Sequence, residues 1–94
     1  MQGGTPQQFI DSLSYGMEQI FIYRGKTICV QGFVESDGLW TITMDQLEPE
    51  SDNWNLWKHR APSIDECVKA FLATPLFDGR TFWEAEGEIE LIFA

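Results

Sequence analysis

Few side chains in this 94-residue chain are of the types that carry out nucleophilic or acid–base chemistry, and they are far apart in the sequence. The only histidine is His59, and the two cysteines are Cys29 and Cys67. Nucleophilic catalysis needs a nucleophile with a base in reach, and no cysteine or serine stands in a motif that supplies one. Cys29 falls in a strand-like run and Cys67 on a helical apolar stripe, so we interpret both as buried packing thiols. His59 is interpreted as a surface imidazole beside Lys58 and Arg60. The sequence predicts no catalytic residue.

Carboxylates are so abundant that no single pair is a strong signal. Glu84 and Glu88 stand at helical spacing, as do Glu86 and Glu90, but a glycosidase-type pair needs a sugar-sized cleft, for which a chain this short leaves little room. Metal binding has four candidates, which lack the central glycine and final glutamate of an EF-hand loop: Asp45, Glu48, Glu50 and Asp52. No glycine-rich loop is placed to hold phosphate. We therefore predict a non-enzymatic protein with no metal and no cofactor.

The net charge is the most informative property of the chain. Fifteen acidic and six basic residues give −9, while 44% hydrophobic and 14% aromatic residues indicate a folded domain and not a disordered acidic tail. Such a charge repels nucleic-acid phosphates and anionic membranes, and the few bases are dispersed, so we expect neither as a partner. The acids either keep the protein soluble or steer it onto a basic surface.

Two acidic segments form the predicted partner-binding surface. The first contains Glu48, Glu50, Asp52 and the aromatic Trp54, and the second contains Glu84, Glu86, Glu88 and Glu90. Lasting affinity would need an aromatic anchor, either Trp54 or Trp83; core packing is the alternative for both and is favoured for Trp83.

The expected partner is a basic protein of the kind that normally holds nucleic acid, which would make this chain an inhibitor or an immunity-type protein. The alternative is an assembly role, a homodimer through the second sheet face, which carries Ile20, Ile22, Cys29 and Phe33.

The length of the chain predicts one domain over residues 1–94, with 1–4 as a flexible end. Strand-like runs cover 17–24, 27–35 and 39–46, and 54–60 fits a short fourth strand. Helix starts of the capping-box type occur at three places: Thr5 with Gln8, Ser63 with Glu66, and Thr81 with Glu84. After the third start the pattern fits a helix or a strand; we favour a helix there and leave 87–93 open.

The turns fix a provisional register. A two-residue turn at Gly25-Lys26 pairs Tyr23 with Ile28, and a three-residue turn at 36–38 pairs Val34 with Trp40. Both turns independently select the same face, which we expect the helices to cover: Phe21, Tyr23, Ile28, Val30, Val34, Trp40, Ile42 and Met44. The predicted fold is α+β, an antiparallel meander of three to four strands with two to three helices packed on one face.

Most of the chain resembles a group of small uncharacterised acidic proteins from Gram-positive gut bacteria and their phages and mobile elements. The similarity lies in residues 9–26, 30–33, 48–53 followed by an aromatic, and 65–90. The group carries no assigned activity, so the resemblance implies only a bacterial or phage origin and a cytoplasmic location. The first residues, MQGGTPQQF, lack the basic and apolar regions of a secretory signal, and two distant cysteines do not form a disulfide framework.

Overall fold

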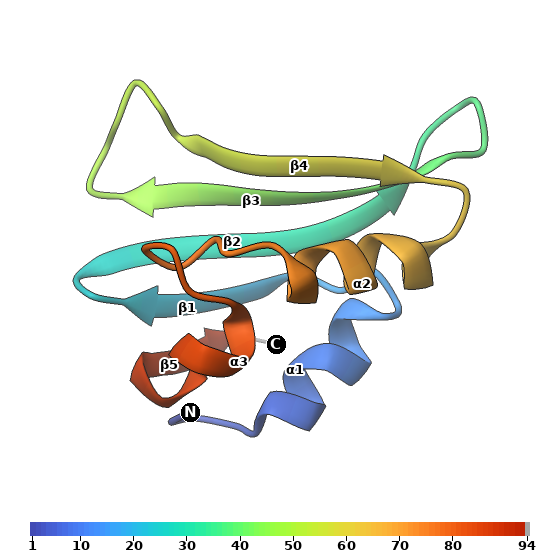
Figure 1. Cartoon of the computed structure of the whole chain (residues 1–94). Helices are drawn as coiled ribbons and strands as arrows, with labels where there is room; N and C mark the ends of the chain where they lie inside the picture. Colours follow the sequence, from blue (N-terminus) through green and yellow to red (C-terminus); the bar gives the residue numbers. More distant parts are fainter. Residues whose placement is uncertain (94) are drawn as a thin grey trace.

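The computed structural model, which describes residues 1–93, is one open five-stranded antiparallel sheet in the order β4-β3-β2-β1-β5. Its helices all lie on the same side of the sheet (Figure 1). The elements in chain order are α1 (Pro6–Leu13), β1 (Gln19–Tyr23), β2 (Lys26–Val34), β3 (Trp40–Glu48), β4 (Asn55–Ala61), α2 (Ile64–Ala73), α3 (Phe82–Ala85), a 3₁₀ turn η1 (Glu86–Glu88) and β5 (Ile89–Phe93). The predicted α+β class is confirmed, and the sheet has one strand more than expected.

The extra strand is at the C-terminal end, where the sequence left helix and strand open. The capping box of Thr81 and Glu84 is present, but α3 lasts only one turn. The chain then turns through η1 and enters β5, which pairs with β1 and buries Ile89 and Leu91 against the core. The alternating apolar pattern therefore prevails over the helical one, because the free edge of β1 offers β5 a ladder of hydrogen-bonding partners.

The second hairpin confirms the predicted register. Val34 pairs with Trp40, and Glu35 N–H donates to the Leu39 carbonyl at 2.8 Å across the turn. Gly38 adopts φ +85°, the left-handed conformation that a three-residue hairpin loop requires.

In the first hairpin the predicted register is wrong by two residues. The turn consists of Arg24 and Gly25, at φ +48° and +77°, so Tyr23 pairs with Lys26 and Phe21 with Ile28. Arg24 is an unusual residue for this conformation, and its guanidinium is held by carboxylates outside the hairpin. A shift of two residues preserves the side-chain face, so the predicted helix-covered face is nevertheless correct.

Aromatic side chains from the sheet and the helices form the core. Phe9 of α1 stacks on Phe82 of α3 at 5.0 Å between ring centroids, and Phe71 of α2 contacts both rings. Six of the eight residues predicted on this face are buried, and Trp40 is half-buried against them. Val34 is 56% exposed, because it lies at the end of β2, the last position on that face before the turn.

The first four residues, predicted to be flexible, lie along β5. Gln2 N–H donates to the Ile89 carbonyl at 2.9 Å, and Leu91 N–H donates to the Gln2 carbonyl at 2.7 Å. A Cβ on Gly3 would fall 2.1 Å from the Leu91 carbonyl oxygen, so the approach requires glycine. This short bridge covers part of the outer edge of β5.

The connection from α1 to β1 crosses β2 at a contact between two glycines. Gly16 adopts φ +76°, and its carbonyl accepts a hydrogen bond from Gly32 N–H at 3.2 Å. A Cβ on Gly16 would lie 2.9 Å from the Gly32 carbonyl oxygen, and one on Gly32 would lie 2.8 Å from Ile64 Cδ1. Gly16, which faces backbone and has a positive φ, therefore excludes larger residues, whereas at Gly32 the Ile64 side chain would have to move.

Candidate functional site

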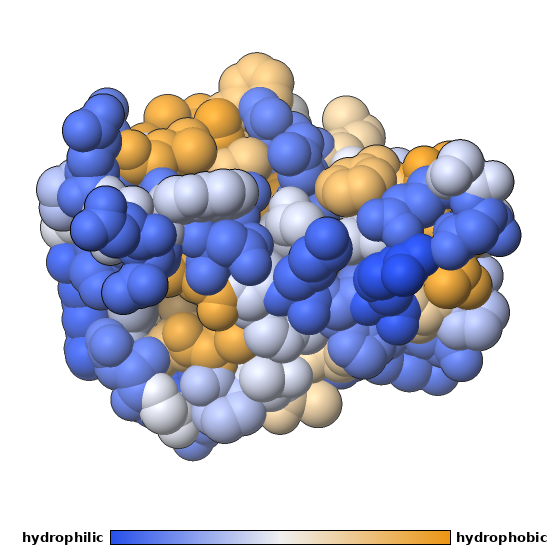
Figure 2. Space-filling model, turned by 90° about the horizontal axis from the view of Figure 1, so that it is seen from above, coloured by the Kyte–Doolittle hydropathy of each residue, from blue (hydrophilic) through white to orange (hydrophobic). Residues whose placement is uncertain are grey.

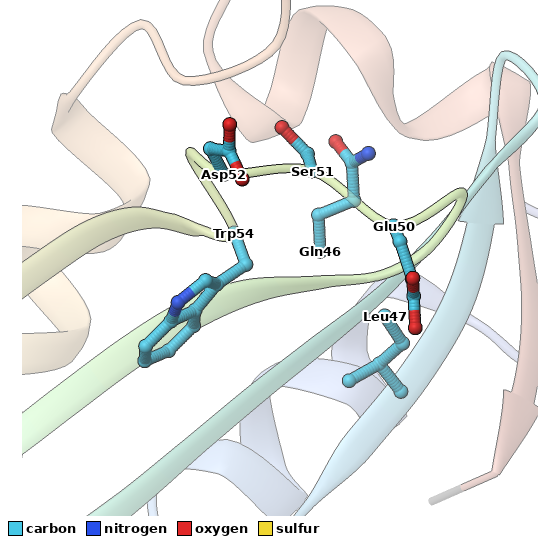
Figure 3. A pocket seen from close by; sticks show the side chains of 6 residues that line it. All are labelled: Gln46, Leu47, Glu50, Ser51, Asp52 and Trp54. Carbon is cyan, nitrogen blue, oxygen red and sulfur yellow. The ribbon is translucent and has the colours of Figure 1, made fainter.

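The first predicted acidic segment surrounds an open depression at the β3–β4 loop. The depression has a volume of about 560 Å³ and is lined by Gln46, Leu47, Glu50, Ser51, Asp52 and Trp54. The Trp54 indole and Leu47 lie on the same side of the loop, whereas the Asp52 carboxylate points to the other side (Figure 3). Gln46 Nε2 donates to the Pro49 carbonyl at 2.7 Å and ties the loop to the end of β3.

The carboxylates of this loop have no internal partner. Within residues 1–93, Glu48, Glu50 and Asp52 accept no side-chain hydrogen bond and form no ion pair, and all three are exposed. Trp54 is 57% exposed, so the core-packing alternative for this residue is wrong. The loop therefore combines free negative charge with an accessible aromatic surface.

The second predicted acidic segment is used mainly inside the protein. Glu84 accepts the Thr81 N–H at 2.9 Å and caps α3, and Glu86 pairs with the N-terminal ammonium at 2.9 Å. Glu88 is bound by two arginines. Only Glu90 has no such partner in the described part of the chain. Sequence spacing could not reveal this division, since the contacts of Glu86 and Glu88 come from distant parts of the chain.

Glu88 is the centre of an ion-pair cluster that holds the first hairpin. Arg24 donates to Glu88 at 2.9 Å and to Asp78 at 2.9 Å, and Arg80 donates to Glu88 and to the Tyr23 hydroxyl. The two arginines lower the pKa of Glu88 to about 2 and, in return, the pKa of each arginine is raised. The cluster keeps the Glu88 carboxylate charged and fixes Arg24 in its left-handed turn.

The nucleophile candidates lie in separate places. Cys29 is 5% exposed on the sheet face away from the helices, and burial raises its pKa to about 11. Cys67 is fully buried on α2 with a raised pKa, and its thiol donates to the carbonyls of Trp40 and His59. The expectation of two buried, unpaired thiols is confirmed. The His59 ring is only half-exposed and is stacked on Trp57 at 5.7 Å, so the surface interpretation of His59 is only partly correct.

The position of Trp83 contradicts the core-packing interpretation that the sequence favoured. It is 53% exposed, although core packing was expected. Its neighbour Phe82 fills the core position on α3, and the short helix leaves Trp83 on the outer side. A single helical turn has too few positions for sequence periodicity to distinguish its buried residue from its exposed one.

The sheet face opposite the helices, here called the open face, brings two of the predicted acids into one row. Glu48 lies opposite Thr27, Thr27 opposite Ile22, and Ile22 opposite Glu90. With strands about 4.8 Å apart, three spacings separate the two carboxylate positions by about 14 Å. Part of each predicted acidic segment therefore reaches the same face.

Comparison of the chain with protein-family models, curated protein sequences and solved structures gives no match. Within residues 1–93, no helix is long and apolar enough to cross a membrane. In the same part of the chain, no three His, Cys, Asp or Glu side chains come together as metal ligands.

Proposed function

We propose that this protein binds a basic segment of another protein through the β3–β4 loop. The observation that carries the proposal is that the acids of the loop have no internal partner: Glu50, Asp52 and the exposed Trp54 line an open depression, and Glu48 precedes them at the end of β3. A lysine or arginine side chain is complementary to this combination, since it can pair with a carboxylate while its charge lies over an aromatic ring. An inhibitor or immunity-type role against a nucleic-acid-binding protein is one setting that such a surface would suit.

The negative charge and the Trp54 indole would contribute to different steps of binding. The −9 net charge accelerates encounter with a positive surface, and this effect weakens as salt screens it. Trp54 and Leu47 supply the apolar contact that slows dissociation. The loop lies at the end of the β3–β4 hairpin, beyond the helices, so a partner can approach it without displacing any element (Figure 1).

The second acidic segment is not part of this proposed surface. Glu84, Glu86 and Glu88 already stabilise α3, the N-terminus and the first hairpin. Binding a partner there would have to compete with these contacts. The proposed surface therefore consists of Glu50, Asp52 and Trp54 in the loop and Glu48 at the end of β3.

Nuclear magnetic resonance titration with an oligo-arginine peptide tests the proposal. We expect shifts concentrated in the loop amides and the Trp54 indole, and we expect them to decrease with salt. The combined change Glu48→Gln, Glu50→Gln and Asp52→Asn should abolish them. The matched control removes three exposed acids elsewhere: Asp11→Asn, Glu18→Gln and Asp65→Asn.

A second pair of variants tests the indole. Trp54→Ala should weaken peptide binding, whereas Trp83→Ala, which removes a similarly exposed indole, should not. Shifts spread evenly over the surface, or equal losses in both sets of variants, would show that the acids are only a solvated surface.

A further inference from the structure

The open face carries apolar side chains that the helices do not cover, although neighbouring residues bury Cys29 and partly bury Ile20 and Ile22. Ile20 pairs with Cys29 on one side and with Phe93 on the other, and Ile22 lies further along β1. Phe93 is 55% exposed and Phe33, on β2, is 41% exposed. Figure 2, which views the molecule from above, shows hydrophobic residues interspersed with hydrophilic ones over the surface seen from that side.

Charge on the β3–β4 half of this face changes sign along the strands, while Glu18, which lies beside Cys29, and Glu90 add negative charge on the β1–β5 half. Asp45 and Glu48 lie toward the C-terminal end of β3, whereas Lys58 and Arg60 lie opposite Thr43 and Thr41, toward its N-terminal end. Arg60 also pairs with Glu35 and Asp37 at 2.6 Å. Lys58 is exposed and has no ion-pair partner in the described part of the chain.

The charges on the β3–β4 half are complementary to themselves. A twofold axis in the plane of the face and perpendicular to the strands reverses the strand direction, which places the Asp45 end of one copy over the Lys58 end of the other. A twofold interface needs this kind of self-complementarity, because the same patch serves both partners. A partner with only basic charge would leave Lys58 facing like charges, whereas Arg60 is already paired with Glu35 and Asp37.

The area of the open face is also close to that of a stable dimer interface. Five strands spaced about 4.8 Å apart, with about seven residues each, cover roughly 550 Å² in projection. The accessible area, with side chains, is larger and approaches the roughly 800 Å² per partner of a stable interface. We infer that the open face binds a second copy of this chain, so that two sheets stack face to face about 10 Å apart. Glu50, Asp52 and Trp54 lie in the loop beyond the strands, so they stay accessible in the dimer, whereas Glu48 lies on the covered face.

Sedimentation equilibrium over a range of protein concentrations tests the inference. We expect a monomer–dimer equilibrium that persists at about 1 M salt, where the Debye length is about 3 Å, because two copies of charge −9 repel less under screening. Phe33→Ala should weaken dimerisation at least tenfold. Val34→Ala is the matched control, because Val34 is the next residue, is also exposed and points to the opposite face.

A charge variant tests the orientation. Lys58→Glu should weaken dimerisation, whereas Lys69→Glu, an identical change on α2, should not. Circular dichroism confirms that each variant is folded. A monomer at every concentration and salt, or equal effects of Phe33→Ala and Val34→Ala, would overturn the inference. These outcomes are separate from the proposed function, which predicts binding of a basic peptide that salt weakens.

Discussion

The Gly16–Gly32 contact gives a prediction with an internal control. Gly16 and Gly25 have almost the same backbone conformation, φ +76° and +77°, but their surroundings differ. A Cβ on Gly25 meets nothing within 4 Å, whereas one on Gly16 lies 2.9 Å from the Gly32 carbonyl oxygen and 3.3 Å from a Trp40 ring carbon. Alanine has the same left-handed strain at both positions. Any difference in the free energy of unfolding between Gly16→Ala and Gly25→Ala therefore measures the contact of Gly16 with β2.

The expected magnitudes follow from these distances. The left-handed conformation costs alanine about 1–2 kcal/mol, which is the whole expected loss for Gly25→Ala. In Gly16→Ala the obstacle is backbone, so the connection must move away from β2 and weaken the hydrogen bond between Gly32 N–H and the Gly16 carbonyl, a bond worth about 1 kcal/mol. With the strain of the displaced backbone added, we expect Gly16→Ala to lose about 3–4 kcal/mol.

Equilibrium unfolding in urea, followed by tryptophan fluorescence, measures both losses. The dependence of the free energy of unfolding on urea should stay unchanged, so that the shift in midpoint reports stability. A domain of this size has a total stability of about 5–14 kcal/mol, so a loss of this size is easily measured. If Gly16→Ala and Gly25→Ala differ by less than about 0.5 kcal/mol, the close approach of the two segments does not constrain the fold as argued.

Three further predictions concern acid stability, thiol reactivity and the core. The Glu88 pKa of about 2 lies below its ordinary value of 4.5, so its contribution to stability is present above about pH 4.5 and is lost as the pH falls toward 2; Glu88→Gln should flatten this part of the profile of unfolding midpoint against pH. Because burial raises the pKa of Cys29 and of Cys67, a thiol reagent near neutral pH should label both rapidly only after denaturation, and rapid labelling of the native protein would contradict their placement. Phe71→Ala should cost about 3–5 kcal/mol in urea unfolding, whereas Tyr15→Ala, at a residue 81% exposed, should cost less than about 0.5 kcal/mol.

The two hairpins show what the sequence could and could not predict of the fold. The register of β2 with β3 followed from the Ser36-Asp37-Gly38 turn, because glycine supplies the one left-handed residue that this loop length needs. The register of β1 with β2 was missed because Arg24 takes a left-handed conformation that its own residue type does not favour. Its stabilising partners, Asp78 and Glu88, are 54 and 64 residues away.

Long-range contacts also limited what the sequence could predict of the candidate site. The sequence identified both acidic segments, because acidic residues are visible as composition. It could not separate free carboxylates from those with internal partners, since the contacts of Glu86 and Glu88 are long-range. Only Glu84 had a local signal, its capping box with Thr81, and that signal was used to predict a helix start.

The position of β5 has a consequence for the order of folding. The other three strand pairings are hairpins between consecutive strands, whereas β1 and β5 are joined by a chain of more than sixty residues. Local pairings form first when loop closure is costly, so β1 is an exposed edge until β5 arrives (Figure 1). Its segment, QIFIY, is uncharged and rich in strand-forming residues, a combination that favours intermolecular pairing. We therefore expect β5 to pair with β1 late in folding and to protect its edge. A folding chain in which β5 is not yet paired would tend to aggregate through β1.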